Sequence, residues 1–344
     1  MAINYATWNT GLVVDVSRYQ RQIRADTLRA AGVRMVIGKL GQAFAMDTKF
    51  QPHRAECNQM DMPLSAYYWP DPIQNARPQA EWLLRQVDAN PDVLAVCGDY
   101  EQWWAAWGPW LEAIQRKIAW AAVKALDPNR ISDVYEEFSE IFAARCEKPL
   151  IAYTSKGFVI SHAPGMAKWL NRYPLWNAAY IWGGGRVVVS WDELKRDWIP
   201  KAGATPLVPP GAGRIVGWQY TGDKLMLPGM YADDAGLERS PADVSIFDPA
   251  WLDLLITGKP APIPEPSPAP APLPLRATVI GSPYINIRSG PGIGYADIGD
   301  LAAGETINVA AVAGNDVWIE IAPGKWACAR TGGRELIRLE RVQE

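Results

Sequence analysis

The feature that most limits how this chain can fold is the proline-rich run at residues 258–275, which reads GKPAPIPEPSPAPAPLPL. Proline removes a backbone donor and fixes φ, so this run is expected to be an extended, semi-rigid polyproline spacer. It divides the 344-residue chain into residues 1–257 and residues 276–344. The first part suits one large α/β domain, and the second suits one small all-β barrel.

Residues 1–257 alternate between two kinds of segment. Short apolar runs rich in Val and Ile predict buried strands at 12–16, 33–38, 64–69, 93–99, 150–153, 178–182, 215–220 and 244–247. Segments of helical length lie at 23–31, 49–60, 79–89, 103–126, 131–145 and 191–198. Such alternation is typical of an α/β barrel or a doubly wound sheet, and eight strands favour an irregular, TIM-like (β/α) barrel.

Composition argues against several function classes. The formal net charge of −3 gives no electrostatic basis for binding nucleic acid or an anionic membrane. No apolar run approaches the roughly 20 residues that a membrane-spanning helix needs. The four cysteines lack CxxC spacing, and only two histidines are present, so neither a metal centre nor a Ser-His-Asp triad is indicated. We therefore expect no metal and no cofactor.

Carboxylates occur at the ends of three predicted strands, and the functional residues of a (β/α) barrel gather at the C-terminal ends of its strands. Asp15 lies near the end of the first strand, Asp99 and Glu101 end the fourth, and Asp243 begins the last. Residues i and i+2 of a strand share a face, so Asp99 and Glu101 project together from backbone positions about 6.6 Å apart. Two carboxylates this close do not both ionise easily, which should raise one pKa toward that of a general acid.

Paired carboxylates are the groups that glycoside hydrolysis requires. One carboxylic acid protonates the leaving oxygen, and a second group stabilises or traps the oxocarbenium-like centre. Other interpretations stay open, because an acid at a strand end can be solvated, cap a helix or pair with arginine. Asp99 could also bind Mg²⁺ with its neighbours, although no phosphate-binding GxxxxGK[ST] loop accompanies it.

Eight segments between residues 11 and 250 carry a family resemblance in their order along the chain. They are DVSRYQ (15–20), KLGQAFAMDTKF (39–50), AYYWP (66–70), GDYEQW (98–103), IAYTSKGF (151–158), YPLWNAAY (173–180), GWQYTGD (217–223) and ADVSIFD (242–248). Together they resemble glycoside hydrolase family 25, the Chalaropsis-type lysozymes, which cleave the β-1,4 bond between N-acetylmuramic acid and N-acetylglucosamine.

The resemblance implies a role for each acid. Glu101 would be the catalytic acid, and Asp99 would position the acetamido group of the substrate or polarise its surroundings. Asp15 and Asp243 would be further acids of the cleft. The family retains anomeric configuration, and the resemblance leaves open whether an enzyme carboxylate or the N-acetyl oxygen of the substrate is the second group.

The resemblance also implies residues that line the cleft and bind substrate, although each could instead pack in the core. They are Tyr67, Tyr153, Trp218 and Gln219. The chain holds 17 Trp, and those at roughly helical spacing are expected to pack rather than bind sugar: Trp103, Trp104, Trp107 and Trp110.

The chain departs from the family in three places. Tyr68 and Trp69 stand where the family often has His and Phe. Residues 102–148 form a longer segment than the compact members need, and residues 182–210 diverge. These departures affect substrate fit and helix placement, but all four acids are present.

Residues 276–344 resemble a bacterial SH3-like domain. The resemblance is carried by YINIRSGPGIGYADIGDLAAGETINV (284–309), VWIEI (317–321) and GKWACA (324–329). Such domains commonly attach enzymes to peptidoglycan, which implies a cell-wall-binding domain here. The alternative is a passive stabilising or dimerising barrel.

The leading hypothesis is a monomeric, modular peptidoglycan hydrolase whose partner is bacterial peptidoglycan, with the glycan strand in the cleft. The alternative is a non-catalytic sugar-binding protein on a lysozyme-like scaffold, which would be expected to have lost some of the acids. The first 20 residues lack a signal-peptide pattern. We therefore expect a phage or prophage endolysin, made in the host cytoplasm and released through a pore or by lysis, or a lysin carried on a virion.

Overall fold

The computed structural model describes residues 3–182, 184–231, 239–258, 275–280, 282–290, 295–309, 311–313, 317–322, 325–331 and 334–341. The chain forms two compact units, Met1–Ala261 and Pro262–Glu344. The predicted polyproline spacer lies, from residue 259 to residue 274, outside the described residues. Among the helices that the structure describes, none is both long and apolar enough to cross a membrane.

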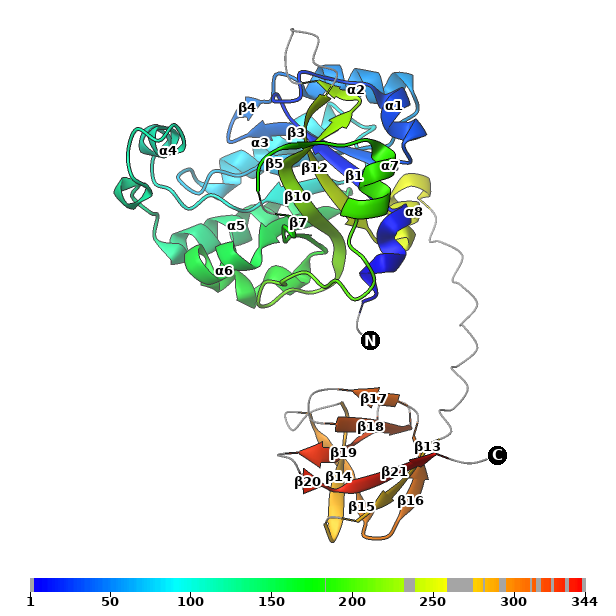
Figure 1. The fold of residues 1–344 in the computed structure, drawn as a ribbon. Coiled ribbons are helices and arrows are strands. Elements are labelled where there is room, and N and C mark those ends of the chain that lie inside the picture. The colour runs from blue at the N-terminus through cyan, green and yellow to red at the C-terminus, as the bar shows by residue number, and fades with distance from the viewer. Residues whose placement is uncertain are drawn as a thin grey trace. The chain divides into compact units, whose positions relative to one another are not determined.

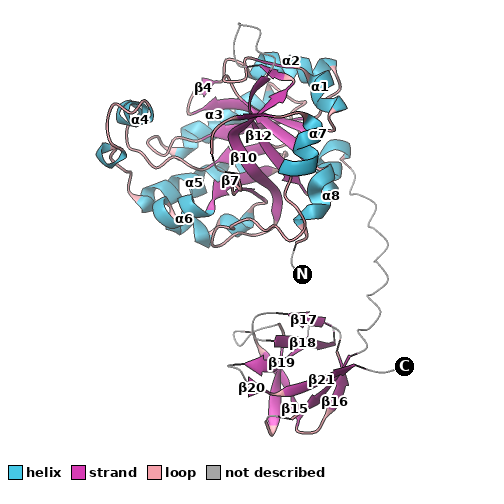
Figure 2. Cartoon of the chain, viewed as in Figure 1, coloured by secondary structure: helices cyan, strands magenta, loops and turns pink. Residues whose placement is uncertain are grey.

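Eight strands close into a barrel in the first unit (Figures 1 and 2). They are β1 (Leu12–Val16), β3 (Met35–Gln42), β5 (Leu64–Trp69), β6 (Val96–Asp99), β7 (Leu150–Ser155), β8 (Leu175–Ala178), β10 (Ile215–Pro228) and β12 (Arg239–Phe247). Their order is β1-β12-β10-β8-β7-β6-β5-β3, and β3 pairs back with β1. Only β12 runs antiparallel to both of its barrel neighbours. The predicted α/β fold with an eight-stranded barrel is confirmed, and β12 makes the barrel irregular.

Helices surround the barrel wall, with the exception of Trp107–Ile114, which stands away from it (Figure 2). They are α1 (Ala25–Ala30), α2 (Phe50–Gln59), α3 (Ala76–Asp88), α4 (Trp107–Ile114), α5 (Pro128–Ala143), α6 (Lys156–His162), α7 (Trp191–Glu193) and α8 (Pro249–Thr257). α5 begins at Pro128 because the carboxylate of Asp127 accepts hydrogen bonds from the next free backbone N–H groups. α8 ends at Thr257 and is capped by Gly258, whose left-handed φ of 65° suits a glycine C-cap.

Several short elements complete the unit. They are the short strands β2 (Gln22–Ile23), β4 (Ala45–Met46), β9 (Val187–Val188) and β11 (Met230–Tyr231), the 3₁₀ turns Tyr5–Thr10, Trp120–Ala122, Pro164–Lys168 and Leu170–Arg172, and the π turn Leu194–Trp198. The π turn continues α7, so the helical segment predicted at 191–198 is present.

Two predicted elements are wrong in their placement. Residues 103–126 do not form one helix, because Arg116 adopts a left-handed φ of 59° and ends the helical path after α4. The strand expected at 178–182 is β8, which instead ends at Ala178. Leu175–Ala178 is buried throughout, whereas Tyr180 and Ile181 are exposed, so only the earlier segment belongs to the barrel wall.

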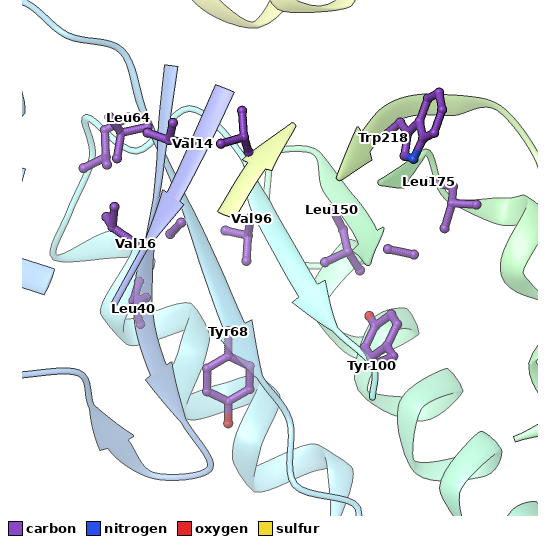
Figure 3. Close-up of a cluster of buried hydrophobic side chains, with 14 of the residues drawn as sticks. Val14, Val16, Leu40, Leu64, Tyr68, Val96, Tyr100, Leu150, Leu175 and Trp218 are labelled. Carbon is purple, nitrogen blue, oxygen red and sulfur yellow. The ribbon is translucent and has the colours of Figure 1, made fainter. Parts of the chain in front are cut away.

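Two apolar layers follow from the alternation of side chains along each strand. One residue set faces outward and packs beneath the helices; it includes Val14, Tyr68, Val96, Tyr100 and Trp218 (Figure 3). The intervening residues face the barrel interior; they include Val13, Ile37, Cys97, Ile151, Trp176 and Phe247. At the open end of the barrel, the next inward-facing residues of these strands line the candidate active site.

The described strands of the second unit form two antiparallel sheets. The first has the order β16-β13-β21, and the second has the order β15-β14-β19-β18-β17 with β20 beside β19. Their bounds are β13 (Leu275–Val279), β14 (Tyr284–Arg288), β15 (Asp297–Ala302), β16 (Thr306–Asn308), β17 (Ala311–Ala313), β18 (Val317–Ala322), β19 (Lys325–Thr331), β20 (Arg334–Glu335) and β21 (Ile337–Arg341). A small apolar core joins the strands; its residues include Val279, Ile285, Leu301, Ile319 and Ile337. All-β strands are therefore present, and the SH3-like assignment stays a prediction.

Candidate active site

A cavity of 640 Å³ opens where the parallel strands of the barrel end. All four predicted acids line it: Asp15, Asp99, Glu101 and Asp243. Three of the four predicted substrate-binding residues line it as well: Tyr67, Tyr153 and Gln219. The tertiary structure thus brings together side chains from six different strands or strand ends. Their roles in substrate binding and catalysis stay predictions at this point.

Asp15 and Asp243 lie directly opposite each other on neighbouring strands. Because β12 runs antiparallel to β1, the beginning of β12 reaches the edge at which β1 ends, and Asp15 pairs with Asp243 in the register. Burial, followed by repulsion from Asp243, raises the pKa of Asp15 well above its usual range. Burial, followed by the Asp223 carboxylate, raises the pKa of Asp243 to about 7. This pair therefore tends to hold a proton near neutral pH.

Asp99 and Glu101 form the second acidic pair, beside the amine of Lys39. Burial and then repulsion from Glu101 raise the pKa of Asp99 well above its usual range, while Lys39 acts in the opposite direction. Burial also raises the pKa of Glu101, again against the effect of Lys39. A carboxyl with a raised pKa can hold a proton near neutral pH and deliver it to a leaving group.

Asp99 also has an unused acceptor. Its Oδ1 atom is buried and has no hydrogen-bond partner in the part of the chain that the structure describes. A buried acceptor without a partner is costly, and a ligand N–H or O–H group would satisfy it. The site is therefore suited to a substrate that carries a donor next to the reacting bond.

A hydrogen-bond network centred on Gln219 holds Asp15 in place. The Gln219 side-chain amide donates to Asp15 Oδ2 at 2.8 Å. Its carbonyl oxygen accepts from the Tyr153 hydroxyl at 2.6 Å and from the Tyr180 hydroxyl at 3.0 Å. The donor from Gln219 opposes the rise in the pKa of Asp15, and the two tyrosines fix the orientation of the amide.

The prediction that Trp218 lines the cleft is wrong. Its side chain is fully buried in the outward-facing layer (Figure 3), where the indole N–H donates to the Ala179 carbonyl at 2.8 Å. Its ring meets Tyr5 edge-on, with centroids 5.3 Å apart. Consecutive residues of a strand point to opposite faces, so Gln219 faces the cavity and Trp218 cannot.

The comparisons with known proteins agree with this architecture. The model of the glycosyl hydrolases family 25 matches residues 14–230. The chain belongs to glycoside hydrolase family 25. It is therefore a glycoside hydrolase, and the acids described above lie in the cleft of a family 25 barrel.

Solved structures of similar fold include a bacterial lysozyme from Streptomyces coelicolor, with a TM-score of 0.50, 16% identity and coverage of 72% of this chain and 97% of that chain. The catalytic domain of an endolysin from a bacteriophage of Listeria monocytogenes has a TM-score of 0.49 and 16% identity, covering 71% of this chain and 96% of that one. A muramidase from Acremonium alcalophilum has a TM-score of 0.49 and 17% identity, covering 72% and 99%. None of the curated proteins compared with the chain matches it.

Several cavity residues of this family 25 domain were not predicted from the sequence. They are Tyr19, Lys39, Trp69, Trp176, Tyr180, Arg186 and Asp223. The Nζ atom of Lys39 lies 4.6 Å from the ring centroid of Trp69 and 5.5 Å from that of Tyr67. Side-chain alternation could have found some of these residues: Lys39 lies two residues after the interior Ile37, and Trp69 lies two after Tyr67.

The buried position of Trp218 leads to a prediction about stability. Replacing Trp218 with Ala should lower the free energy of unfolding by about 3–5 kcal/mol, because it leaves a cavity in a packed layer. Trp218→Phe, which keeps most of the apolar volume, should hydrolyse substrate with a KM close to that of the wild type. Urea unfolding and steady-state kinetics measure the two effects. A raised KM for a fully folded Trp218→Phe protein would show instead that Trp218 contributes to substrate binding.

The raised carboxyl pKa values predict a stability that depends on pH. Asp243 binds its proton more tightly in the folded chain, so the folded state loses stability as pH rises from near 3.8 to about 7. Asp243→Asn should flatten this decline when melting temperatures are compared at pH 5 and pH 8. Asp133→Asn on α5 is the matched control, because Asp133 is exposed and lies outside the cavity. If the melting temperature of Asp243→Asn falls between pH 5 and pH 8 as much as that of the wild type, the raised pKa of Asp243 does not cause the decline.

Proposed function

We propose that this family 25 glycoside hydrolase is a peptidoglycan hydrolase. It acts as an N-acetylmuramidase and cleaves the β-1,4 bond between N-acetylmuramic acid and N-acetylglucosamine. The observation that carries the proposal is the pair Asp99 and Glu101, a buried and a half-buried carboxyl with raised pKa values that line a 640 Å³ cleft. Membership of the family supports the same substrate class.

In the proposed mechanism, Glu101 is the general acid. Burial raises its pKa and so favours the protonated form, which can donate a proton to the glycosidic oxygen as the bond breaks. Asp99 accepts a hydrogen bond from the acetamido N–H of the substrate through its unpartnered Oδ1. When the proton of the pair is on Glu101, Asp99 is the ionised partner and stabilises the positive charge that develops. We propose that the reaction retains anomeric configuration. An enzyme carboxylate or the N-acetyl oxygen of the substrate bonds to the anomeric carbon as the leaving oxygen departs. Water then displaces that group from the opposite face and returns a proton to Glu101.

The products of the reaction test this proposal. Purified cell walls treated with the protein should lose turbidity, and the new reducing ends should be N-acetylmuramic acid. NMR of the first product formed should show the β-anomer. Reducing ends of N-acetylglucosamine would indicate a different glycosidase, and wall binding without any new reducing ends would indicate a non-catalytic sugar-binding protein.

The second unit, in this proposal, is an SH3-like domain that attaches the enzyme to the wall. Its support is the described set of antiparallel strands around a separate core, together with the resemblance of residues 284–309. The pairing of a hydrolase domain with such a domain suits an endolysin or a lysin carried on a virion. Tethering would raise the effective concentration of the cleft at its polymeric substrate.

Removal of the second unit should separate binding from catalysis. A chain that ends at Gly258 is expected to bind purified walls at least about tenfold more weakly, because one of two linked binding sites is lost. Its turnover of a soluble oligosaccharide should stay close to that of the full chain. Co-sedimentation and reducing-end assays give the two quantities, and unchanged wall binding would leave the second unit as a passive module.

A further inference from the structure

Residues 103–126, here called the tryptophan arm, leave the barrel immediately after Glu101. The arm contains α4, which stands away from the other helices (Figure 1), and the turn Trp120–Ala122. Backbone hydrogen bonds close its base: Ala105 N–H donates to the Lys124 carbonyl at 2.9 Å, and Leu126 N–H donates to the Trp103 carbonyl at 2.8 Å. The arm is therefore an excursion that starts and ends beside the catalytic pair.

A continuous row of aromatic rings connects the arm to the cleft. Trp69, which lines the cavity, has its ring centroid 5.9 Å from that of Trp104. Trp104 lies 6.0 Å from Trp103, and Trp103 lies 6.3 Å from Trp120. Contacts at these separations are typical of edge-to-face and offset aromatic pairs, so the rings hold one another in place.

A buried polar network fixes the base of this row. The Asp71 carboxylate accepts from the Gln102 amide at 2.8 Å and from the Trp107 indole N–H at 3.3 Å. The carbonyl oxygen of Gln102 in turn accepts from the indole N–H of Trp69 at 3.2 Å. The same residues thus orient a cleft-lining ring and the first part of the arm, which makes their arrangement pre-organised for binding.

The outer end of the row is open to solvent. Trp120 is 51% exposed, whereas Trp104 is buried at the centre of the arm. His162 stacks on Trp103 with ring centroids 5.0 Å apart and an angle of 13° between the ring planes, which covers one face of Trp103. The exposed part of the Trp120 indole adds little to the packing of its own domain, and its ring is accessible to a ligand.

We propose that Trp120 binds a sugar ring of the glycan strand at a position beyond the cleaved bond. The proposal rests on the proposed muramidase function and places Trp120 at the outer end of a row of ring contacts that starts at Trp69 in the cleft and passes through Trp104 and Trp103. The C–H face of a pyranose is apolar and stacks on an indole, while its hydroxyl groups stay in water. The occupant is the glycan strand, because the row is continuous with the cleft in which that strand is cut.

The test compares substrates of different length. Wild-type protein should show a KM that falls as soluble glycan strands lengthen from a tetrasaccharide to strands of many disaccharides. Trp120→Ala should raise the KM for long strands about tenfold, the factor that 1.4 kcal/mol of binding free energy gives, with kcat nearly unchanged. For the tetrasaccharide, the KM of Trp120→Ala should differ from that of the wild type by less than about twofold. Leu111→Ala is the control, because Leu111 is exposed on α4 but outside the row of rings.

The outcomes separate the possible errors. If the wild type cleaves neither substrate, the proposed function fails. If Trp120→Ala, with an unchanged melting temperature, cleaves long and short strands as the wild type does, the proposal about the arm fails while the function stands. Equal losses in Trp120→Ala and Leu111→Ala would also overturn it. The proposal would also fail if the wild type bound phosphatidylglycerol vesicles and both substitutions abolished that binding without changing KM. The arm would then contact a membrane.

Discussion

Glu101→Gln should reduce hydrolysis of purified cell walls by about three orders of magnitude, within the range that a general acid contributes. The amide has nearly the shape of the carboxyl group but cannot transfer a proton to the glycosidic oxygen. The folded structure should persist, because the substitution removes a half-buried ionisable group whose pKa desolvation has already raised. The rate of release of reducing ends, measured on the same wall preparation, checks the prediction.

A matched substitution controls for the chemical change itself. Glu137 is an exposed residue of α5, outside the cavity, so Glu137→Gln should retain full activity. The pH profile of the wild type supplies a second readout: kcat should fall as pH rises through the raised pKa of Glu101. If wild type and Glu101→Gln clear walls equally well, Glu101 is not the catalytic acid.

Asp99→Asn should lower kcat/KM by about a hundredfold, the size expected when one electrostatic contact to the transition state is lost. The same substitution should raise the melting temperature, because a buried carboxylate close to Glu101 is replaced by a neutral amide. Opposite changes in activity and stability are typical of a residue whose charge serves the reaction rather than the fold. Steady-state kinetics and thermal unfolding measure the two quantities.

The coupling between the two acids gives a further readout for the same variant. Repulsion between Asp99 and Glu101 is mutual, so a neutral residue 99 should move the alkaline limb of the pH–rate profile to lower pH. Asp88→Asn at the end of α3 provides the control, because Asp88 is exposed and far from the cavity lining. A profile that does not move, with unchanged activity, would remove Asp99 from the mechanism.

Much of the barrel could be predicted from local patterns. Seven of the eight apolar runs correspond to barrel strands, because a strand buried on both faces must be apolar along its whole length, and the run at 178–182 meets β8 only at Ala178. The errors lie where tertiary contacts override propensity. The spacing in residues 103–126 predicts one helix, but the chain reverses at Arg116 and Trp104 forms a bridge with Ala125. Local periodicity does not contain such a reversal.

The candidate site could be predicted in part. The spacing of Asp99 and Glu101 predicts that both side chains share one face of the strand, and both line the cavity. The same rule of alternation excludes Trp218 once Gln219 is placed in the cleft. It also indicates Lys39 and Trp69, which follow interior residues by two positions. Trp218 was mispredicted because a motif match alone does not say to which face of the strand each residue points.

The sequence by itself predicted the number of barrel strands and the acidic residues that line the cavity. These features depend on composition and short-range spacing, which a single chain displays directly. Only the tertiary structure decided that Asp243 faces Asp15, because this pairing requires the last strand to enter the barrel antiparallel to its neighbours. Only closure of the barrel placed Gln219 against Asp15, more than two hundred residues away in sequence. Strand direction and barrel closure are long-range properties, and they set the charges that surround Glu101.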